Sequence, residues 1–272
     1  MKSMSGFGGG VASLIMKTAA GGGEDIITDN LVLHYDAGNS SSYSGSGTTW
    51  NDLSSSNNDG TLTNGPTFDS GNGGSIVLDG INDRVDASNF FNSNDNFTFS
   101  VWLNSDTFSG TNEYTIISSH THSAAFKFQY VNGTGLQINK SWVGPNVGTF
   151  SSSTLSTGTW YNLTITRQMT SYPTKTYTLY INGSFTSSFT SGVTYDRYPK
   201  CIGKSWSETN SLWDGKIAKV FAYSTNLTAS EVLQNYNVSK SRFGLDEIVT
   251  DNLVLNLDAG DSSSYSGSGN TW

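Results

Sequence analysis

Two stretches of this chain are near copies of each other. Residues 26–50 read IITDNLVLHYDAGNSSSYSGSGTTW and residues 248–272 read IVTDNLVLNLDAGDSSSYSGSGNTW, so that five of 25 positions differ at an offset of 222 residues. Self-similarity at a fixed offset marks the beginning of a repeating structural unit. One unit therefore starts near Ile26 and closes before Ile248, where a second unit starts.

The repeat divides the chain into three parts. We expect residues 1–25 to be a glycine-rich N-terminal docking arm and residues 26–244 to be one domain. Residues 245–272 are expected to be a linker and the truncated start of a second repeat. The 25 residues of the second copy, 248–272, are too few to enclose a core. We expect that the natural chain continues past Trp272. The alternative is that the second copy, residues 248–272, forms a terminal strand that pairs with a neighbouring sheet.

Short alternating segments, broken by Gly, Asn and Ser, fill the region between the two copies. Phe97, Phe99 and Val101 would share one face of a strand over 97–102, and Trp160 opens another strand, where we expect it to be buried. Two Asn-Gly pairs, 132–133 and 182–183, are typical of hairpin turns. The pattern predicts an all-β, two-sheet antiparallel sandwich. Further strands are predicted at 31–35, 75–79, 84–87, 114–119, 125–131, 135–140, 159–168, 175–182, 200–205 and 216–223.

One helix is predicted near the end of the domain, at 227–236. Thr228 and Glu231 have the spacing of a capping box, in which each side chain accepts a hydrogen bond from the backbone of the other. Leu227, Val232 and Tyr236 could share the buried side of this helix. We expect it to close one side of the sandwich.

Several short patterns follow one another along the chain. They are Ser75–Gly80 with Arg84-Val85, Phe97–Leu103, Gly158–Leu163, Leu179–Gly183, Ile202-Gly203, and Asp214–Ile217 before the Leu-Thr-x-x-Glu helix. In this order they resemble the laminin-G-like jelly-roll family of the concanavalin A-like lectin/glucanase superfamily, over about residues 30–243. The resemblance implies a jelly-roll sandwich with one short C-terminal helix.

The same superfamily includes glycosidases, which need two carboxylates at a fixed separation. The related glucanases carry a Glu-x-Asp-x-x-Glu pattern. The glutamates of this chain, Glu24, Glu113, Glu208, Glu231 and Glu247, form no such pattern. We therefore expect that the protein is not an enzyme and has no catalytic residue.

Charge and cysteine content exclude other classes of function. The net charge is −8 and the chain has no run of Lys or Arg, which argues against nucleic-acid binding. No stretch is long and apolar enough to insert into a membrane. Cys201 is the single cysteine, so no intrachain disulfide can form, which favours assembly in a reducing cytoplasm.

Three tryptophans and one amide are the candidate ligand-binding residues. Trp142, Trp206 and Trp213 fall near predicted loops or strand ends, and Asn210 lies between the last two. Aromatic faces with nearby amides suit a sugar-binding cleft. The alternative is that the tryptophans fill the core or a subunit interface.

Two groups of residues are candidate metal ligands. Asp79, Asn82 and Asp83 offer oxygens at a tight turn, as calcium requires, and the alternative is that they cap the amides of their own hairpin. His120 and His122 could face the same side of a strand and bind a metal, or could be exposed loop residues. No cofactor is required on this interpretation, and calcium is an optional one.

The two ends of the domain narrow the resemblance further. Its opening and closing segments, 30–50 and 234–244, resemble domains of marine tailed-phage structural proteins. The resemblance implies a virion protein, a fibre, spike or decoration assembled in the host cytoplasm. Residues 1–25 would dock on other virion proteins through the apolar run 11–16, which is shorter than a signal-peptide core. We expect a homo-oligomer that presents the sandwich to host-surface glycan. The alternative is a secreted bacterial adhesin or carbohydrate-binding module with tandem lectin-like domains.

Overall fold

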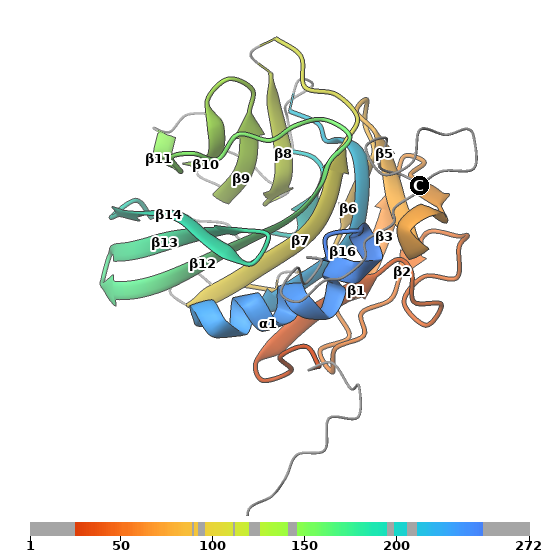
Figure 1. Ribbon diagram of the computed structural model, residues 1–272, viewed down its shortest axis with the longest axis horizontal. Helices are drawn as coiled ribbons and strands as arrows, with labels where there is room; N and C mark the ends of the chain where they lie inside the picture. The colour runs from red at the N-terminus through yellow and green to blue at the C-terminus, as the bar shows by residue number, and fades with distance from the viewer. Residues whose placement is uncertain are drawn as a thin grey trace, which may run out of the picture.

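The structure, a computed structural model, describes residues 25–246 except 89, 92–95, 111, 120–125, 141–145, 195–198 and 206–210. Within these ranges the chain forms two antiparallel β-sheets packed face to face, with one α-helix on the outside (Figure 1). The predicted all-β sandwich with a short C-terminal helix is confirmed. Nearly all of the predicted arm and of the second repeat lies outside the described residues.

The helix-side sheet contains eight strands of the described chain. β16 lies near its middle and pairs with β7 on one side. On the other side of β16, the first half pairs with β5 and the second half with β1. In spatial order the strands are β14 (Ser184–Ser191), β13 (Thr174–Ile181), β12 (Trp160–Ser171), β7 (Phe97–Ser105), β16 (Asp214–Tyr223), β5 (Ser75–Asp79) and β4 (Thr67–Asp69), with β1 (Leu31–Asp36) beside β16.

The opposite sheet also has eight strands among the described residues. Short strands form one half of this sheet, where β15 joins β8 to β6. In spatial order the strands are β11 (Asn146–Thr149), β10 (Gly135–Lys140), β9 (Phe126–Val131), β8 (Glu113–Ser118), β15 (Cys201–Ile202), β6 (Arg84–Asp86), β3 (Gly60–Thr63) and β2 (Thr49–Trp50).

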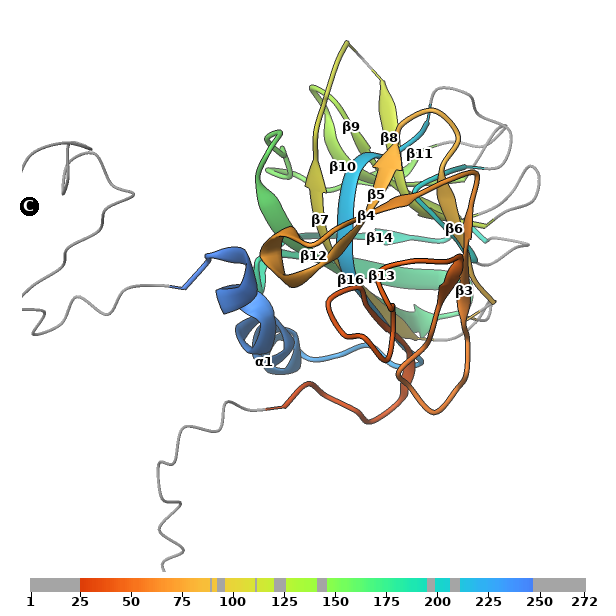
Figure 2. The same cartoon turned by 90° about the vertical axis from the view of Figure 1, so that its right-hand side faces the viewer.

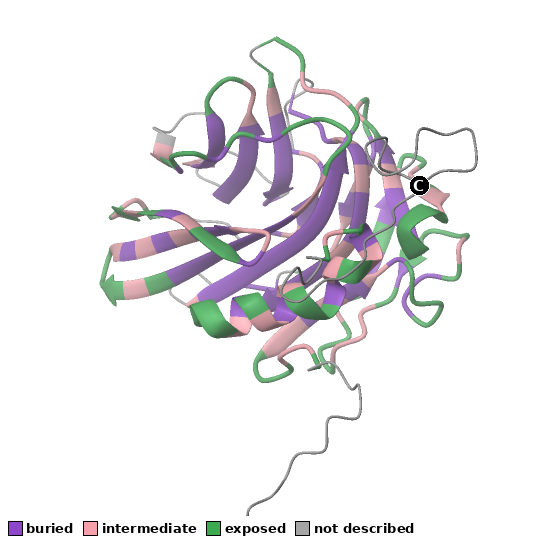
Figure 3. Cartoon of the chain, in the orientation of Figure 1, coloured by how far each residue is buried: buried purple, intermediate pink, exposed green. Residues whose placement is uncertain are grey.

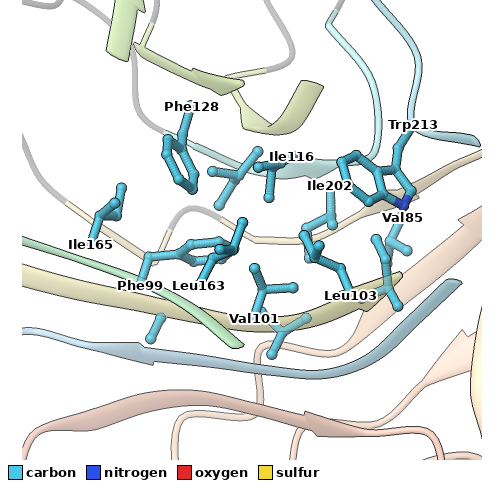
Figure 4. Close-up of a cluster of buried hydrophobic side chains, with 14 of the residues drawn as sticks. Val85, Phe99, Val101, Leu103, Ile116, Phe128, Leu163, Ile165, Ile202 and Trp213 are labelled. Carbon is cyan, nitrogen blue, oxygen red and sulfur yellow. The ribbon is translucent and has the colours of Figure 1, made fainter. Parts of the chain in front are cut away.

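The main core lies between the sheets and follows from strand alternation. Phe97, Phe99 and Val101 of β7 point inward as predicted and belong to the main core. Figure 4 shows Phe99 and Val101 on the side of β7 that faces Ile116 of β8 and Phe128 of β9. Figure 3 shows β7 buried along its whole length, whereas the exposed residues gather in loops and at the sheet edge. Each such apolar side chain contributes about 1.5–3 kcal/mol when it is fully buried.

Helix α1 (Ala229–Ser239) covers the outer face of the helix-side sheet (Figure 2). The predicted capping box is present, because Thr228 accepts from the Glu231 amide and Glu231 accepts from the Thr228 amide. Val232 is buried against the sheet. No helix within the described ranges is long and apolar enough to cross a membrane.

Trp160 corrects one prediction of the sequence. It begins β12 but lies on the outer face of the sheet, half-buried, rather than in the main core. Its ring packs 4.8 Å from that of Phe243, and its Nε1 donates to Asn72 Oδ1 at 3.2 Å. The fully buried tryptophan of this outer cluster is Trp102, whose ring stacks on Phe243 at 4.1 Å. The difference arises because strand alternation places residues 160 and 163 on opposite faces.

Candidate functional site

Three loops meet at one end of the sandwich and enclose a cavity of about 370 Å³, which we call the rim pocket. The turn after β5 and the loop between β7 and β8 form two of its sides. The third side is the segment that leads into β16. The described residues that line it are Gly80, Thr107, Ser109, Asn112, Tyr114, Leu212 and Asp214.

The turn after β5 is held by its own acidic side chains. Asp79 Oδ1 accepts from the backbone amides of Ile81 at 2.9 Å and Asn82 at 3.3 Å, and Asp83 Oδ2 accepts from the Asp79 amide at 3.2 Å. Gly80 adopts φ +67° and lies so close to Asp214 that an added Cβ would meet the Asp214 Cβ at 2.8 Å. The turn therefore presents backbone to the pocket and leaves Ile81 pointing outward, 71% exposed.

The loop between β7 and β8 is anchored from both ends. The Asp106 amide donates to the Asp214 carbonyl at 3.0 Å, and the Ser109 amide donates to the Tyr114 hydroxyl at 2.7 Å. The Phe108 ring lies against the ring of Tyr114, 5.0 Å between centroids. These contacts hold Thr107, Ser109 and Asn112 at the pocket wall, where they supply two hydroxyls and an amide.

The electrostatics of the rim pocket are set by carboxylates. Asp79 and Asp214 are direct register partners across β5 and β16. Burial, followed by the charges of Asp106 and Asp79, raises the pKa of Asp214 above its ordinary value. Burial and the charge of Asp79 likewise raise the pKa of Asp83, although the Asp79 amide opposes this. The rim is thus an acidic region in which neighbouring carboxylates repel one another.

The predicted metal ligands of the turn serve mainly to cap it. Asp79 and Asp83 accept from backbone amides as described above, and the Asn82 carbonyl accepts from Asn64 Nδ2 at 2.9 Å. The described part of the chain contains no group of three or more His, Cys, Asp or Glu residues arranged to hold a metal ion. The hydrogen bonds of Asp79 and Asp83 are those that the hairpin-capping alternative requires. His120 and His122 lie outside the described residues.

Of the predicted ligand-binding tryptophans, the structure describes Trp213. Trp213 is fully buried in the main core, where Figure 4 shows it beside Val85 and Leu103, so its ring has no face open to a ligand. This position agrees with the alternative that the tryptophan fills the core. Trp142, Trp206 and Asn210 lie outside the described residues. The neighbours of Trp213 on both sides, Leu212 and Asp214, nevertheless line the rim pocket.

Glu113 is a described glutamate that a catalytic role would require to be examined, and its environment favours the ionised form. Its Oε2 lies 2.7 Å from Lys127 Nζ and 3.2 Å from Ser211 Oγ. Burial raises the pKa of Glu113, but the hydrogen bond and charge of Lys127 and the hydrogen bond from Ser211 outweigh this and lower it overall. A carboxylate held in this way suits an ion pair rather than a general acid.

Comparison with known families identifies the domain. Residues 78–233 match the family model of the Concanavalin A-like lectin/glucanases superfamily. Because the match covers more than half of the 272 residues, the chain belongs to this family. This confirms the superfamily that the sequence patterns resemble. A search of the curated proteins gave no match.

Solved structures share the fold at low identity. Domain 4 of AbnA, an extracellular arabinanase of Geobacillus stearothermophilus, solved with arabinotriose, is 18% identical, with a TM-score of 0.59 over 77% of this chain and 100% of that domain. The binding domain of botulinum neurotoxin serotype G is 20% identical, with a TM-score of 0.55 over 78% of this chain and 52% of that one. Trypanosoma rangeli sialidase is 13% identical, with a TM-score of 0.52 over 78% and 33%. This chain thus spans about half of the toxin domain and a third of the sialidase, and the likeness establishes the fold alone.

Proposed function

We propose that this domain is a non-catalytic glycan-binding module whose ligand occupies the rim pocket. The observation that carries the proposal is the set of groups on the pocket wall. Thr107, Ser109 and Tyr114 contribute hydroxyls, Asn112 an amide and Asp214 a carboxylate. These groups donate to and accept from hydroxyls, and the cavity of about 370 Å³ is in the usual range for small-ligand sites.

Two further observations support the proposal. Ile81 is exposed and directly follows Gly80 of the pocket lining in sequence, so an apolar side chain is available next to a residue of the pocket wall. Small-molecule sites use this combination. In addition, the arabinanase domain that has the same fold was solved in complex with a sugar, arabinotriose.

A glycan array tests this function. We expect the protein to retain at least one class of glycan, and the Asn112→Ala variant to lose most of that signal because it removes a pocket amide. Asn237→Ala is the matched control, since Asn237 is an exposed amide on α1, away from the pocket lining. A wild-type protein that retains no glycan would overturn the proposal, as would equal losses in both variants.

Catalysis is the competing function at the same site. Asp79 and Asp214 face each other across two strands, and glycosidases use carboxylate pairs. However, Asp79 Oδ1 already accepts from two turn amides, which commits it to the backbone. We therefore propose binding without hydrolysis. Chromatography of a retained glycan after prolonged incubation with the protein should show no shorter product, and appearance of one contradicts this point.

We further propose that the protein is a structural component of a tailed-phage virion, a fibre, spike or decoration that presents the domain for host attachment. The low content of charged residues, the glycine-flanked apolar run near the N-terminus and the resemblance of the domain ends support this role. Residues 1–25 would dock on other virion proteins, and the protein would act as a homo-oligomer. Gold-labelled antibody on purified particles should decorate a defined part of the virion. Label found instead on bacterial cell surfaces would favour the adhesin alternative.

A further inference from the structure

One aspartate lines the rim pocket, and three further aspartates are linked to it through the fold. Asp214 lines the pocket, Asp79 is its direct partner on the neighbouring strand, and the Asp106 amide binds the Asp214 carbonyl. Asp83 closes the turn that Asp79 opens, and its Oδ1 is buried with no hydrogen-bond partner. These residues come from three segments far apart in the sequence, so the arrangement is a product of the fold.

The cations nearest to these aspartates along the chain are engaged elsewhere. Lys216, two residues from Asp214 on the same strand, forms an ion pair with Asp69 of β4. Arg84, which follows Asp83, binds the Asp86 carboxylate at 3.0 Å. The charges that act on Asp214 are those of Asp79 and Asp106, and both raise its pKa. The pocket wall therefore carries a carboxylate, Asp214, whose strand partner is a second aspartate and whose nearest cations along the chain are paired with other residues.

A carboxylate in this setting favours a ligand that brings positive charge. The described residues form no cluster suited to a metal ion. The wall instead carries hydroxyls and an amide, spread over a cavity large enough for a sugar ring. A protonated amine carried on a polyhydroxylated ring would use both sets of groups, because the ammonium donates to carboxylates while the ring hydroxyls pair with the wall.

We infer that the rim pocket selects glycans that carry free amino groups, such as oligomers of a 2-amino sugar, over their N-acetylated and acidic counterparts. The inference rests on the proposed glycan-binding function and names its ligand class. An N-acetyl group removes the charge from the same ring, and a uronic acid brings a like charge to the aspartates. The expected order of affinity is therefore amine, then N-acetyl, then acid.

Calorimetric titration with a matched pair of ligands tests the inference. The ligands are the trimer of glucosamine and the trimer of N-acetylglucosamine, at about pH 6.5, where amines of the α-amino type are mostly protonated. We expect the amine trimer to bind roughly fivefold more tightly, the upper end of what one solvent-exposed ion pair contributes. The preference should shrink between about 20 mM and 300 mM salt because screening weakens exposed charge pairs.

Two variants test whether the preference for the amine arises at the rim pocket. Asp214→Asn should abolish most of the preference for the amine, whereas Asp29→Asn, at an exposed position outside the pocket lining, should leave it unchanged. Equal binding of both trimers by the parent overturns the inference but leaves the proposed function standing. If no array glycan and neither trimer binds, the proposed function itself is overturned. Tri-lysine that binds as tightly as the amine trimer would show recognition of charge alone and would also overturn the inference.

Discussion

Arg242 Nη1 donates to Asp36 Oδ1 at 2.5 Å, although 206 residues separate the two in sequence. Asp36 ends β1, the first strand of the domain, and Arg242 follows α1 in a 3-10 turn, Lys240–Phe243. The same carboxylate lies 3.2 Å from Lys219 Nζ on β16. Arg242 also donates to the backbone carbonyls of Asn72 and Gly74. One guanidinium thus joins the beginning of the domain to its end.

We expect Arg242→Ala to lower the free energy of unfolding by about 2–3 kcal/mol, the range for a hydrogen bond to a charged group whose partner stays partly buried. Asp36→Asn should destabilise by a similar amount. The double variant should cost less than the sum, because both changes remove the same contact. Urea denaturation of all four proteins measures this. Strictly additive effects would show that the contact contributes no coupling energy.

His34 makes the stability depend on pH. Burial, with a smaller contribution from the Lys219 charge, lowers the pKa of His34 to about 4, although Asp36 and Asp52 oppose the shift. An unfolded histidine titrates near about 6.5, so the unfolded chain takes up its proton first as the pH falls. The contribution of His34 to stability is therefore complete above about pH 6.5 and is lost towards pH 4.

The variant His34→Asn tests this dependence and introduces the residue that the second repeat carries, Asn256. Its stability at neutral pH should fall modestly, because the ring that stacks 4.6 Å from Phe221 is lost. The decrease in urea midpoint between about pH 7 and pH 5, where histidine titration contributes most, should be smaller than in the parent. An unchanged decrease would mean that another group titrates over this range.

Replacing either tryptophan of the outer cluster by alanine should lower the free energy of unfolding, but by different amounts. Trp102→Ala should destabilise by about 3–5 kcal/mol, the usual loss for a fully buried large aromatic. Trp160→Ala should cost roughly 1–2 kcal/mol, because it loses one hydrogen bond to Asn72 and only part of its packing. Thermal and urea midpoints of the two variants give the comparison. Equal costs would place Trp160 deeper than the structure has it.

Ile81 offers a binding test that does not disturb the fold. The side chain is 71% exposed, and the turn depends on its backbone amide rather than on the side chain. We expect Ile81→Ser to keep the unfolding midpoint of the parent and to bind the array-selected glycan several-fold more weakly. Leu233→Ser is the control, since Leu233 is 44% exposed on α1 and outside the pocket lining. A parallel loss in the control would indicate a general surface effect.

Strand alternation and capping residues made much of the fold predictable. The eleven predicted strands are present, and the capping box of α1 is formed by Thr228 and Glu231. Five other strands of the described residues were missed, and they lack the alternating apolar signal. β2 has two residues, β4 has three, and β14 reads SFTSSFTS at the edge of its sheet. Such edges are stabilised by backbone pairing, which leaves little trace in side-chain type.

The candidate site was less visible in the sequence, because no single segment contains it. The turn at Asp79-Gly80 and the segment around Trp213 were both singled out, and both do contribute to the rim pocket. Thr107, Ser109 and Asn112 belong to no motif. They reach the pocket only through the pairing of β16 with β5 and β7, which sets register over more than one hundred residues. A usable signal was the Asp-Gly pair at 214–215, because Asp214 is the register partner of Asp79 in the Asp-Gly pair at 79–80.

A crystal structure of the protein soaked with its strongest array glycan tests the central claim most directly. The account predicts density for one sugar ring in the rim pocket, with hydrogen bonds to Asn112 and Asp214 and a contact with Ile81. Density for the glycan elsewhere, for example on the outer face of the opposite sheet near Glu113 and Lys127, with the rim pocket empty, would contradict it.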